Sequence, residues 1–599
     1  MKLVELTLAR YRQFIDQRLL IDPNVTTIVG RNDTGKTGLL SHFFDQSVYE
    51  GVIAGGDRPL VPGYQGASTA FSMVWHITAD DFDSIQFPEE FGTRGAKNLE
   101  ILFQDQAGPV KHWNYRLDGT PIEAYEGPDE RGAPSRKKSF RLRKILPTPL
   151  YLGPLRRLVE PHFQMQAYDS PGVVESERER LSFEHRRLSP ESILLRVAGV
   201  LAFTRNRLES SEPWNGSMRT PPSASQQDLE QKLHQLAERI TEKLQTFWRD
   251  PSGLIFDIRI VAAGAATYSI IWNVRDGAGL TYHGTGLMWF VSFIVDWLFI
   301  EEFPGPLLLL LDEPAGPLHP SAQRVVAKIL SSLSSRHQLI YGTHSPFMID
   351  WNFPQRIRLF TRDHDSKRAH IDNKPYAPRL GMPQSVWDPL REAIGVTVGD
   401  IVVLGERNIL VEGVTEQILL ANASAFFETL NKPHIDLAAT SIIPYSDSTA
   451  LKYVIAKARS RQTHAIVLGD SDDHGRSVEH LCTREGVSYL AVGTFSDRTD
   501  GDRSIEDVIG TVDYVSAVNE FYRTFDWFVP INVDQVHSEI GNRSLGKYLK
   551  DLFAERFERS LDKIGVAIYI AQGMSNLAPD ALARLQALVD QLCRSAAAV

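Results

Sequence analysis

The chain has 599 residues, too many for a single hydrophobic core, and we expect it to divide into roughly two to four domains. Hydrophobic residues make up 43% of it and charged residues 23%, which excludes an intrinsically disordered chain. The formal net charge of −10 excludes a protein that coats nucleic acid indiscriminately, although it is compatible with a local DNA-binding groove.

Three features of the sequence indicate the compartment. The longest apolar stretch, residues 287–300, is interrupted by Asp296 and is shorter than the ~18 residues that a membrane-spanning helix needs. The N-terminal sequence lacks the apolar core and cleavage site of a signal peptide. Cys482 and Cys593 are too few for a disulfide framework or a cysteine-rich zinc site. We therefore expect a cytoplasmic protein with no membrane partner.

The first predicted unit is a strand, a phosphate-binding loop and a helix. The apolar run VTTIVG leads into GRNDTGKT, which matches G-x-x-x-x-G-K-[ST] without deviation. Gly30 and Gly35 let backbone N–H groups wrap the phosphates of ATP, and the helix N-terminus favours their negative charge. Lys36 is expected to reach the β- and γ-phosphates, and Thr37 to ligate Mg²⁺. Asn32 is a further expected nucleotide contact.

Short alternating runs (FSMVWHIT, LEILFQD and HWNYRLDG) predict β-structure between residues 50 and 150, in the same lobe. A basic cluster follows them, formed by Arg136, Lys137, Lys138, Arg141, Arg143 and Lys144. Such a run is typical of a solvated loop or strand face, and the alternative is a track for DNA phosphates.

Between residues 175 and 250 the sequence becomes that of charged helices, interrupted by a Ser- and Pro-rich loop over 210–227. One apolar stripe recurs at intervals of three and four residues: Leu229, Leu233, Leu236, Ile240, Leu244 and Phe247. This pattern predicts a packing seam, either within the chain or in a dimer, rather than a ligand site.

After residue 250, the strand-like runs LIFDIRIVAA and TYSIIWNV precede a helix and the apolar run LLLLLDEP. That run has the form of a Walker B strand, in which Asp312 orients the Mg²⁺ shell and Glu313 polarises the attacking water. Another predicted strand, residues 338–342, ends next to His344, which would sense the γ-phosphate. The alternative for this histidine is an ordinary structural role.

The spacing of these motifs predicts a split ATPase, because 276 residues separate Lys36 from Asp312. ABC-type and chromosome-maintenance-type ATPases are divided in this way, and a second subunit presents a signature loop to the γ-phosphate. The usual Leu-Ser-Gly-Gly is absent here, and His-Gly-Thr-Gly stands in its place. Gly284 and Gly286 in that loop are expected to donate backbone N–H groups to phosphate in trans.

A second α/β unit is predicted beyond a boundary at residues 365–400. The run NILVEG ends in Glu412, and HAIVLGDSD ends in Asp470 and Asp472, whose side chains face the same side of a strand end. Glu506 and Asp507 follow as an acidic pair. Because clustered carboxylates are costly without divalent cations, the pattern predicts a Mg²⁺ or Mn²⁺ site. The alternative is that each carboxylate caps a helix or turn.

Taken together, these residues resemble the OLD (overcoming lysogenisation defect) family of ATP-dependent nucleases over essentially the whole chain. They are also similar to the nuclease subunit of the Gabija antiphage system and to retron-associated OLD nucleases. The resemblance implies an α/β protein: a split ABC-type P-loop ATPase with a helical dimerisation insertion, followed by a C-terminal Toprim α/β domain. We expect the boundaries 1–160 (N-terminal ATPase lobe), 161–250 (insertion), 251–395 (C-terminal ATPase lobe) and 396–599 (Toprim).

The resemblance also assigns roles within the Toprim pattern. Glu412, Asp470 and Asp472 match its metal ligands, and Glu506 or Asp507 matches the later acidic position used for a second metal. A C-terminal lysine of the family is thought to stabilise the transition state. Lys563 matches its usual setting before a helix, and Lys547 and Lys550 are competing candidates.

The resulting hypothesis is an ATP-binding and ATP-hydrolysing endonuclease that cleaves DNA with two divalent cations about 4 Å apart. The resemblance implies a homodimer or homotetramer that acts in bacterial antiphage defence, with a possible helicase or retron-type partner. The first alternative is an ATPase sensor or clamp whose Toprim domain does not cleave and which works through a partner effector. The second is a Toprim enzyme of another reaction type, such as strand passage or primer synthesis.

Overall fold

The computed structural model describes residues 1–40, 70–78, 81, 97–105, 111–122, 146–153, 163–166, 226–247, 256–264, 267–274, 285–303, 305–363, 365–376, 405–445, 447–498 and 500–597. The basic cluster at residues 136–144 and Gly284 lie outside these ranges. The chain divides into two compact units. Unit 1 comprises Met1–Ile349 and Arg358–Asn373, and unit 2 comprises Asp350–Ile357 and Lys374–Val599.

Unit 1 is built on a mixed sheet of twelve described strands in the order β7-β6-β5-β4-β1-β2-β15-β14-β3-β13-β12-β8. The first seven strands along the chain are β1 (Lys2–Tyr11), β2 (Phe14–Leu20), β3 (Val25–Gly30), β4 (Ala70–Ile77), β5 (Lys97–Asp105), β6 (Lys111–Leu117) and β7 (Thr120–Ile122). The others are β8 (Thr148–Leu152), β12 (Leu307–Asp312), β13 (Gln338–Thr343), β14 (Ile357–Arg362) and β15 (Ala369–Asp372). These bounds confirm the strands predicted from the alternating and apolar runs.

The strands β3, β13, β12 and β8 pair in parallel and form the part of the sheet that carries the nucleotide motifs. Alternate leucines of β12 enter two different hydrophobic cores: Leu309 contributes to one, and Leu308 and Leu310 to the other. Both faces of this strand are therefore buried, which explains why its sequence is uniformly apolar rather than alternating.

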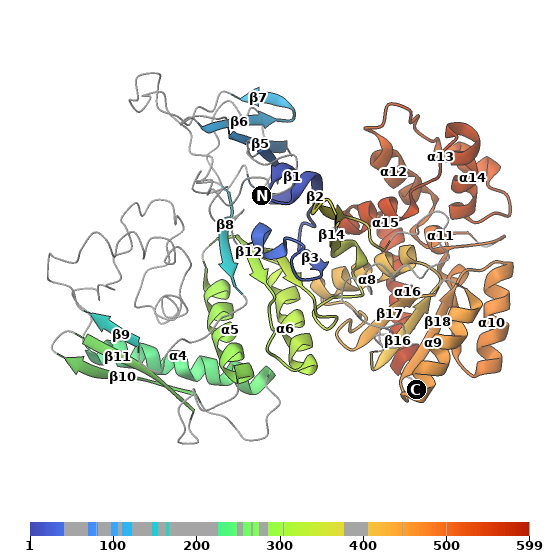
Figure 1. The fold of residues 1–599 in the computed structure, drawn as a ribbon. Helices are drawn as coiled ribbons and strands as arrows, with labels where there is room; N and C mark the ends of the chain where they lie inside the picture. Colours follow the sequence, from blue (N-terminus) through green and yellow to red (C-terminus); the bar gives the residue numbers. More distant parts are fainter. Residues whose placement is uncertain are drawn as a thin grey trace. The chain divides into compact units, whose positions relative to one another are not determined.

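Helices α4 (Gln226–Phe247), α5 (Thr285–Glu302) and α6 (Pro320–Leu333) contribute to the first of these cores. Figure 1 shows α5 and α6 side by side next to β8 and β12. The apolar stripe of α4 packs within the chain, because Leu236, Ile240 and Leu244 are buried in this core. Its last turn also contacts α5, where the ring centroids of Phe247 and Trp297 lie 5.0 Å apart.

A separate antiparallel sheet of unit 1 has the order β10-β11-β9, with β9 (Phe163–Gln166), β10 (Phe256–Gly264) and β11 (Thr267–Val274). The strands β10 and β11 form a long hairpin in the region where LIFDIRIVAA and TYSIIWNV predict strands. The predicted helical character of residues 175–250 is confirmed for α4, and the remainder of that stretch lies outside the described residues.

Unit 2 contains a parallel sheet in the order β17-β16-β18-β19, with β16 (Arg407–Val411), β17 (Thr440–Pro444), β18 (His464–Gly469) and β19 (Ser488–Ala491). Ile409 and Val411 point into one core and Leu410 into the other, so β16 is buried on both faces. Because the strands are parallel, the residues that follow them gather at one edge of the sheet.

Helices surround this sheet and continue to the end of the described chain. They are α8 (Val414–Thr429), α9 (Ser448–Ser460), α10 (Asp473–Glu485), α11 (Ile505–Ile509), α12 (Thr511–Tyr522), α13 (Val533–Glu539), α14 (Leu545–Phe557), α15 (Lys563–Gln572) and α16 (Pro579–Ala597). The predicted second α/β unit is thus present. Its division from unit 1 follows Asn373, whereas the sequence suggests a boundary between 395 and 396, and residues 377–400 lie outside the described ranges.

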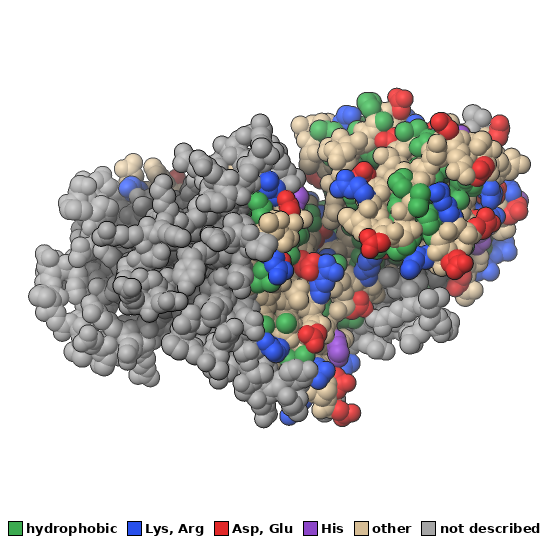
Figure 2. Space-filling model, turned by 90° about the horizontal axis from the view of Figure 1, so that it is seen from above, with side chains coloured by type: hydrophobic (Ala, Val, Ile, Leu, Met, Phe, Trp, Pro, Cys, Tyr) green, Lys and Arg blue, Asp and Glu red, His purple; other side chains and the backbone are tan. Residues whose placement is uncertain are grey.

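The surface carries charges of both signs. Figure 2 shows Lys and Arg side chains interspersed with Asp and Glu over the described residues on the face that it presents. Of the helices in the described part of the chain, none combines the length and the apolarity that crossing a membrane requires.

Candidate functional site

The phosphate-binding loop follows β3, as the motif predicts. Gly30 and Gly35 are required by close packing: a Cβ at Gly30 would lie 2.5 Å from the Phe360 carbonyl oxygen, and one at Gly35 would lie 2.3 Å from the Gln13 amide. Gly35 also has φ +99°, a backbone conformation that other residues rarely adopt. Asn32 is exposed in the same loop. Contacts within the protein and the left-handed backbone at Gly35 therefore account for both glycines of the motif.

Lys36 is buried, and its side chain folds back over the loop. Its Nζ donates to the carbonyl oxygens of Gly30 at 2.7 Å and Arg31 at 3.0 Å, and it lies 3.5 Å from Glu313 Oε1. Burial lowers the pKa of Lys36, and the Glu313 carboxylate opposes that shift. A phosphate that enters the loop would exchange the neutral carbonyl acceptors for a charged one, which strengthens the hydrogen bonds of the ammonium.

Asp312 lies buried at the end of β12, next to the threonine of the phosphate loop. The Thr37 hydroxyl and Asp312 are joined by a hydrogen bond, and Tyr151 donates to Asp312 Oδ2 at 3.4 Å. Burial is the largest cause that raises the pKa of Asp312. Its Oδ1 is buried with no hydrogen-bond partner among the described residues. Such an oxygen fits Mg²⁺, a hard cation that prefers carboxylate and hydroxyl ligands.

Glu313 connects Lys36 to His344. Its Oε2 accepts from the His344 backbone N–H at 3.1 Å and lies 2.8 Å from His344 Nδ1, while Oε1 faces Lys36. Glu313 has φ 46°, which is uncommon for a residue with a side chain and marks the tight turn after β12. The structure therefore brings the predicted carboxylate and histidine together beside the phosphate loop.

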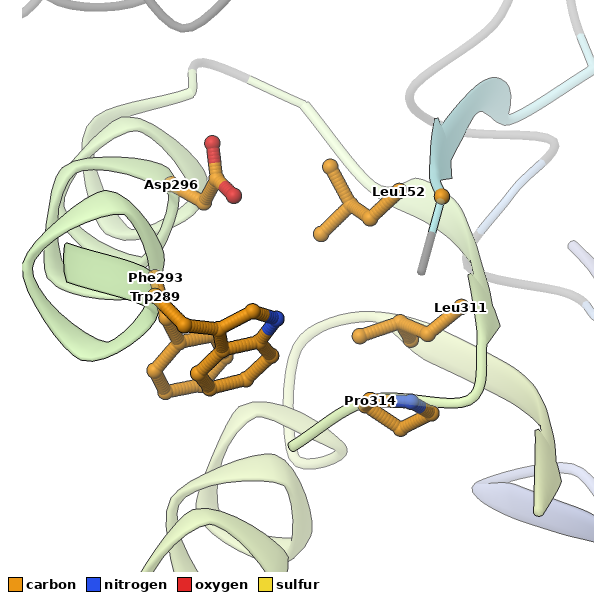
Figure 3. Close-up of a pocket in the computed structure, with 7 residues that line it drawn as sticks. Leu152, Trp289, Phe293, Asp296, Leu311 and Pro314 are labelled. Carbon is orange, nitrogen blue, oxygen red and sulfur yellow. The ribbon is translucent and has the colours of Figure 1, made fainter. Parts of the chain in front are cut away.

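Gly286 lies in the first turn of α5, where a Cβ would come no closer than 3.5 Å to Leu318. Local packing therefore does not require glycine at this position. The same helix lines a small cavity beside the end of β12, with space on the order of one water molecule. Figure 3 shows Trp289, Phe293 and Asp296 facing Leu152, Leu311 and Pro314 across it. The cavity is too small for a nucleotide.

The second group of predicted residues lies in unit 2, at the edge of its sheet where the strands end. Glu412 follows β16 and Asp470 follows β18, which are neighbouring strands. Burial raises the pKa of Glu412, and it raises the pKa of Asp470 well above its usual range, with further contributions from nearby carboxylates. Glu412 Oε2 is buried without a hydrogen-bond partner among the described residues. These carboxylates therefore share one poorly hydrated location.

A carboxylate that the sequence analysis missed belongs to the same cluster. Glu416 lies in the first turn of α8, one helical turn after Glu412. Burial raises the pKa of Glu416 to about 7, and Glu506 and Glu412 add to the shift, whereas Lys563 opposes it. The sequence offered one signal, since Glu416 lies in the first turn of the helix that directly follows the Glu412-Gly413 strand end.

Glu506 and Lys563 form an ion pair in which Lys563 Nζ lies 2.9 Å from Glu506 Oε1. Burial alone would raise the pKa of Glu506, but the Lys563 ammonium and the Ser504 hydroxyl lower it below its ordinary value. Burial opposes the charge on Lys563, yet Glu506 and its acidic neighbours raise the lysine's pKa. The lysine is thus held as a cation among carboxylates.

Glu506 and Asp507, the two candidates for the later acidic position, have different hydrogen-bond partners in the structure. Asp507 accepts hydrogen bonds from Ser504 N, Leu545 N and Arg498 Nη1 at 2.9–3.1 Å. It closes the capping box at the start of α11, so its oxygens are occupied by protein donors. Glu506 is therefore the member of the pair that faces the acidic cluster.

Asp472 is close enough to Glu412 to raise its pKa, and its Oδ1 also accepts from Gly475 N at 2.7 Å as the N-cap of α10. The predicted ligand and the predicted cap are thus the same residue. As they stand, no three His, Cys, Asp or Glu side chains within the described ranges are gathered closely enough to hold a metal ion. Lys547 and Lys550 are exposed on α14, and the ion pair distinguishes Lys563 from them.

Comparison with known proteins supports the nucleotide site. Residues 200–349 match an AAA ATPase domain family, a span that contains Asp312, Glu313 and His344. Together with the phosphate loop, this match confirms the predicted P-loop ATPase domain, an α/β fold with a mixed sheet.

Curated relatives match parts of the chain. An uncharacterised protein of Methanocaldococcus jannaschii is 28% identical over 119 residues, which are 19% of this chain and 30% of that protein. The OLD nuclease of Thermus scotoductus is 23% identical over 178 residues, which are 27% of this chain and 30% of that protein. The chain therefore covers less than a third of the length of these relatives.

Solved structures include heads of SMC proteins. The Smc head bound to the C-winged helix domain of ScpA is 11% identical, with a TM-score of 0.32 over 62% of this chain and 97% of that chain. The SMC head domain from Thermotoga maritima is 12% identical, with a TM-score of 0.29 over 62% of this chain and 98% of that chain.

Proposed function

We propose that the chain is an ATP-binding and ATP-hydrolysing, divalent-metal-dependent DNA endonuclease whose cleavage is regulated by nucleotide. The observation that carries the proposal is the Lys563–Glu506 ion pair inside a cluster of buried carboxylates at the edge of the unit 2 sheet. A cation next to several acidic groups suits a site that binds both metal ions and the phosphate of a nucleic acid. The similarity to an OLD nuclease supports the same reaction class.

We assign the role of the Toprim nuclease domain to unit 2. Glu412, Glu416, Asp470, Asp472 and Glu506 would hold Mg²⁺ or Mn²⁺, since carboxylate oxygens suit both ions. The bound ions would supply an activated water and neutralise the charge that develops at the scissile phosphate.

Lys563 has a distinct role in this site. Its ammonium, held by Glu506, would bind a non-bridging oxygen of the scissile phosphate and stabilise the negative charge there. Because neighbouring carboxylates raise its pKa, the lysine stays protonated throughout the neutral pH range and acts as an electrostatic group, not as a base.

At the ATP site, Lys36 would bind the β- and γ-phosphates, and Thr37 and Asp312, which are hydrogen-bonded to each other, would hold Mg²⁺. Glu313 polarises the attacking water, and His344 orients the Glu313 carboxylate through its backbone N–H and its ring. Gly284 and Gly286 would serve a partner subunit's nucleotide, as in other split ATPases. This arrangement requires at least a homodimer, and a homotetramer is also compatible with it.

A nucleotide-regulated DNA endonuclease of this kind would act in antiphage defence in the bacterial cytoplasm, with a helicase or retron-type partner supplying or selecting the DNA. The helical insertion over residues 161–250 would form the dimer contacts. The apolar stripe of α4 would not take part, because it is buried within the chain.

The test is cleavage of supercoiled plasmid, linear duplex DNA and RNA, followed by electrophoresis with Mg²⁺ or Mn²⁺ and with EDTA. Metal-dependent nicking or linearisation of the plasmid, changed in rate by ATP, supports the proposal. Cleavage that persists in EDTA, or cleavage of RNA alone, contradicts it.

A further inference from the structure

A short segment of the chain leaves unit 1 and is built into unit 2. Unit 1 ends at Ile349 and resumes at Arg358, and the residues between them, Asp350–Ile357, belong to unit 2. We call Asp350–Ile357 the connecting segment. It begins six residues after His344, the histidine that contacts Glu313 at the ATP site. A shift at that histidine therefore has a short covalent path into the other unit.

The connecting segment is anchored to the edge strand β17 by one side-chain amide. Asn352 Oδ1 accepts from Ile442 N at 2.8 Å, and its Nδ2 donates to Thr440 O at 2.9 Å and to Leu437 O at 3.2 Å. The amide thus takes the place that the peptide group of a neighbouring strand would have. Because these groups are buried, loss of the amide leaves backbone donors and acceptors unsatisfied.

A second amide joins the connecting segment to α8. Gln417 Nε2 donates to Trp351 O at 2.7 Å and to Ile442 O at 2.7 Å. Gln417 directly follows Glu416, the carboxylate in the first turn of α8. Phe353 of the segment is also buried in the core that α8 shares. The segment is therefore fixed to the helix whose N-terminus carries part of the acidic cluster.

On the unit 1 side, the residues just before the connecting segment are also held in place. Ser345 Oγ donates to Gln323 Oε1 at 2.6 Å, and Tyr341 OH donates to Met348 O at 2.7 Å. Two hydrogen bonds to unit 1 thus hold the chain between His344 and Asn352. A segment anchored at both ends in this way provides a physical route for coupling between two sites.

We propose that Asn352 and Gln417 are positioning residues that couple the nucleotide state at Glu313 and His344 to the placement of Glu416. The expected consequence is that nucleotide changes the cleavage rate through this segment, and this rests on the proposed nuclease function. The γ-phosphate of ATP, which ADP lacks, would lie near the Glu313–His344 pair, so we expect the two nucleotides to bias the connecting segment differently.

The test compares Asn352→Leu, which keeps the volume of the side chain and removes its amide, with wild type. Cleavage of plasmid DNA is measured with metal alone and with a non-hydrolysable ATP analogue, and ATP hydrolysis is measured in parallel. We expect wild type to show a rate ratio of roughly fivefold or more between the two conditions. In Asn352→Leu the ratio should approach one, while ATP hydrolysis stays within about twofold.

Asn519→Leu is the matched control, because Asn519 makes the same pair of amide bonds to Ile531 N and O elsewhere in unit 2. It should lose comparable stability and keep the wild-type ratio. An unchanged ratio in Asn352→Leu, or an equal loss of the ratio in Asn519→Leu, overturns the coupling role.

Amide hydrogen exchange separates this inference from the proposed nuclease function. In wild type, the ATP analogue should change exchange in peptides covering Asp350–Ile357, β17 and the first turn of α8. In Asn352→Leu the change should be confined to unit 1. If wild type cuts no DNA, the nuclease proposal fails while this experiment still decides the coupling, and equal exchange of these unit 2 peptides with and without analogue overturns it.

Discussion

Lys563 Nζ lies 2.9 Å from Glu506 Oε1, so one of the three candidate lysines is paired with one of the two acidic residues expected at the second metal position. Gly546 in the first turn of α14 makes room for this contact. A Cβ there would lie 2.6 Å from Lys563 Nζ and 2.7 Å from Glu506 Cδ. The pair thus depends on three segments that are distant in sequence.

Removing the lysine should abolish cleavage without affecting the ATPase. We expect Lys563→Ala to reduce DNA cleavage by 10²-fold or more, on the order of the loss of one electrostatic stabiliser. Plasmid cleavage and phosphate release, measured on the same preparation, check this expectation. Lys547→Ala and Lys550→Ala are the controls, and a loss of cleavage in either that equals the loss in Lys563→Ala contradicts the assignment.

Gly546→Ala tests the geometry of the pair with both charges retained. The added methyl group would displace the Lys563 ammonium or the Glu506 carboxylate, and a misplacement of about 1 Å costs on the order of 10²-fold in rate. Gly573→Ala is the matched control, since the nearest atom to its Cβ is the Asn576 amide at 3.2 Å. Equal cleavage by the two variants would show that close approach at Gly546 is unimportant.

Neutralising Glu416 should affect stability in a metal-dependent way. In metal-free buffer, Glu416→Gln removes one of several buried carboxylates that repel one another, and Tm should rise by a few degrees, the shift expected for about 1 kcal/mol. The increase in Tm that Mn²⁺ produces in wild type should be smaller in the variant. Differential scanning calorimetry with and without Mn²⁺ measures both effects.

Glu479→Gln, on the exposed face of α10, provides the reference for that experiment. It should change neither Tm in metal-free buffer nor the Mn²⁺-dependent increase. A destabilised Glu416→Gln in metal-free buffer would mean that Glu416 forms a stabilising contact and does not belong to a metal-binding cluster.

Glu313 should matter for ATP hydrolysis and not for ATP binding. In Glu313→Gln we expect hydrolysis to fall by about 10²- to 10⁴-fold, the usual contribution of a positioned base. Binding should be equal or tighter, because the carboxylate that lies 3.5 Å from Lys36 Nζ no longer competes with phosphate. Titration with a fluorescent ATP analogue measures the affinity, with Lys36→Ala as the variant that loses binding; weaker binding by Glu313→Gln contradicts the expected competition.

The ATPase motifs were predictable because each depends on a local pattern. The phosphate loop and the strand that ends in Asp312 are short apolar runs followed by the reactive residues. The ends of β16 and β18 are predictable for the same reason, and they locate Glu412 and Asp470. The sequence also suggests Lys563 by its position before a helix.

The parts that the sequence does not predict depend on long-range packing. The strand β17 (TSIIP) is short and ends in proline, so its pattern is weak. Whether Glu506 or Asp507 faces the cluster is decided by Leu545 N and Arg498, which reach Asp507 from other segments. The insertion of Asp350–Ile357 into unit 2 has no local sequence signal, because the amide of Asn352 bonds with residues about 90 positions away.

His337 gives unit 1 a pH-dependent stability. Burial lowers the pKa of His337 to about 4, and its Nδ1 accepts from Leu307 N at 3.1 Å. The pKa of His337 in the folded state lies below the ordinary 6.5, so protonation favours the unfolded chain. The stability that the neutral, buried His337 provides is therefore complete above pH 6.5 and is lost as pH falls from 6.5 towards 4. Between pH 7.5 and 5.5 the loss should be about 1 kcal/mol.

Urea unfolding of wild type and His337→Asn at the two pH values measures this effect. The asparagine can accept the same hydrogen bond and does not titrate, so the difference between pH 7.5 and 5.5 should be smaller in the variant by about 1 kcal/mol. The same pH dependence in both proteins would show that other groups cause it.

Whether unit 2 is a nucleotide-regulated nuclease is decided by plasmid cleavage with Mg²⁺ or Mn²⁺, with and without ATP, by wild type, Asp470→Ala and Lys36→Ala. We expect metal-dependent cleavage by wild type, none by Asp470→Ala, and cleavage by Lys36→Ala that no longer responds to ATP. Cleavage by Asp470→Ala at the wild-type rate would contradict this expectation, because the acidic edge of the unit 2 sheet would then not be the nuclease site.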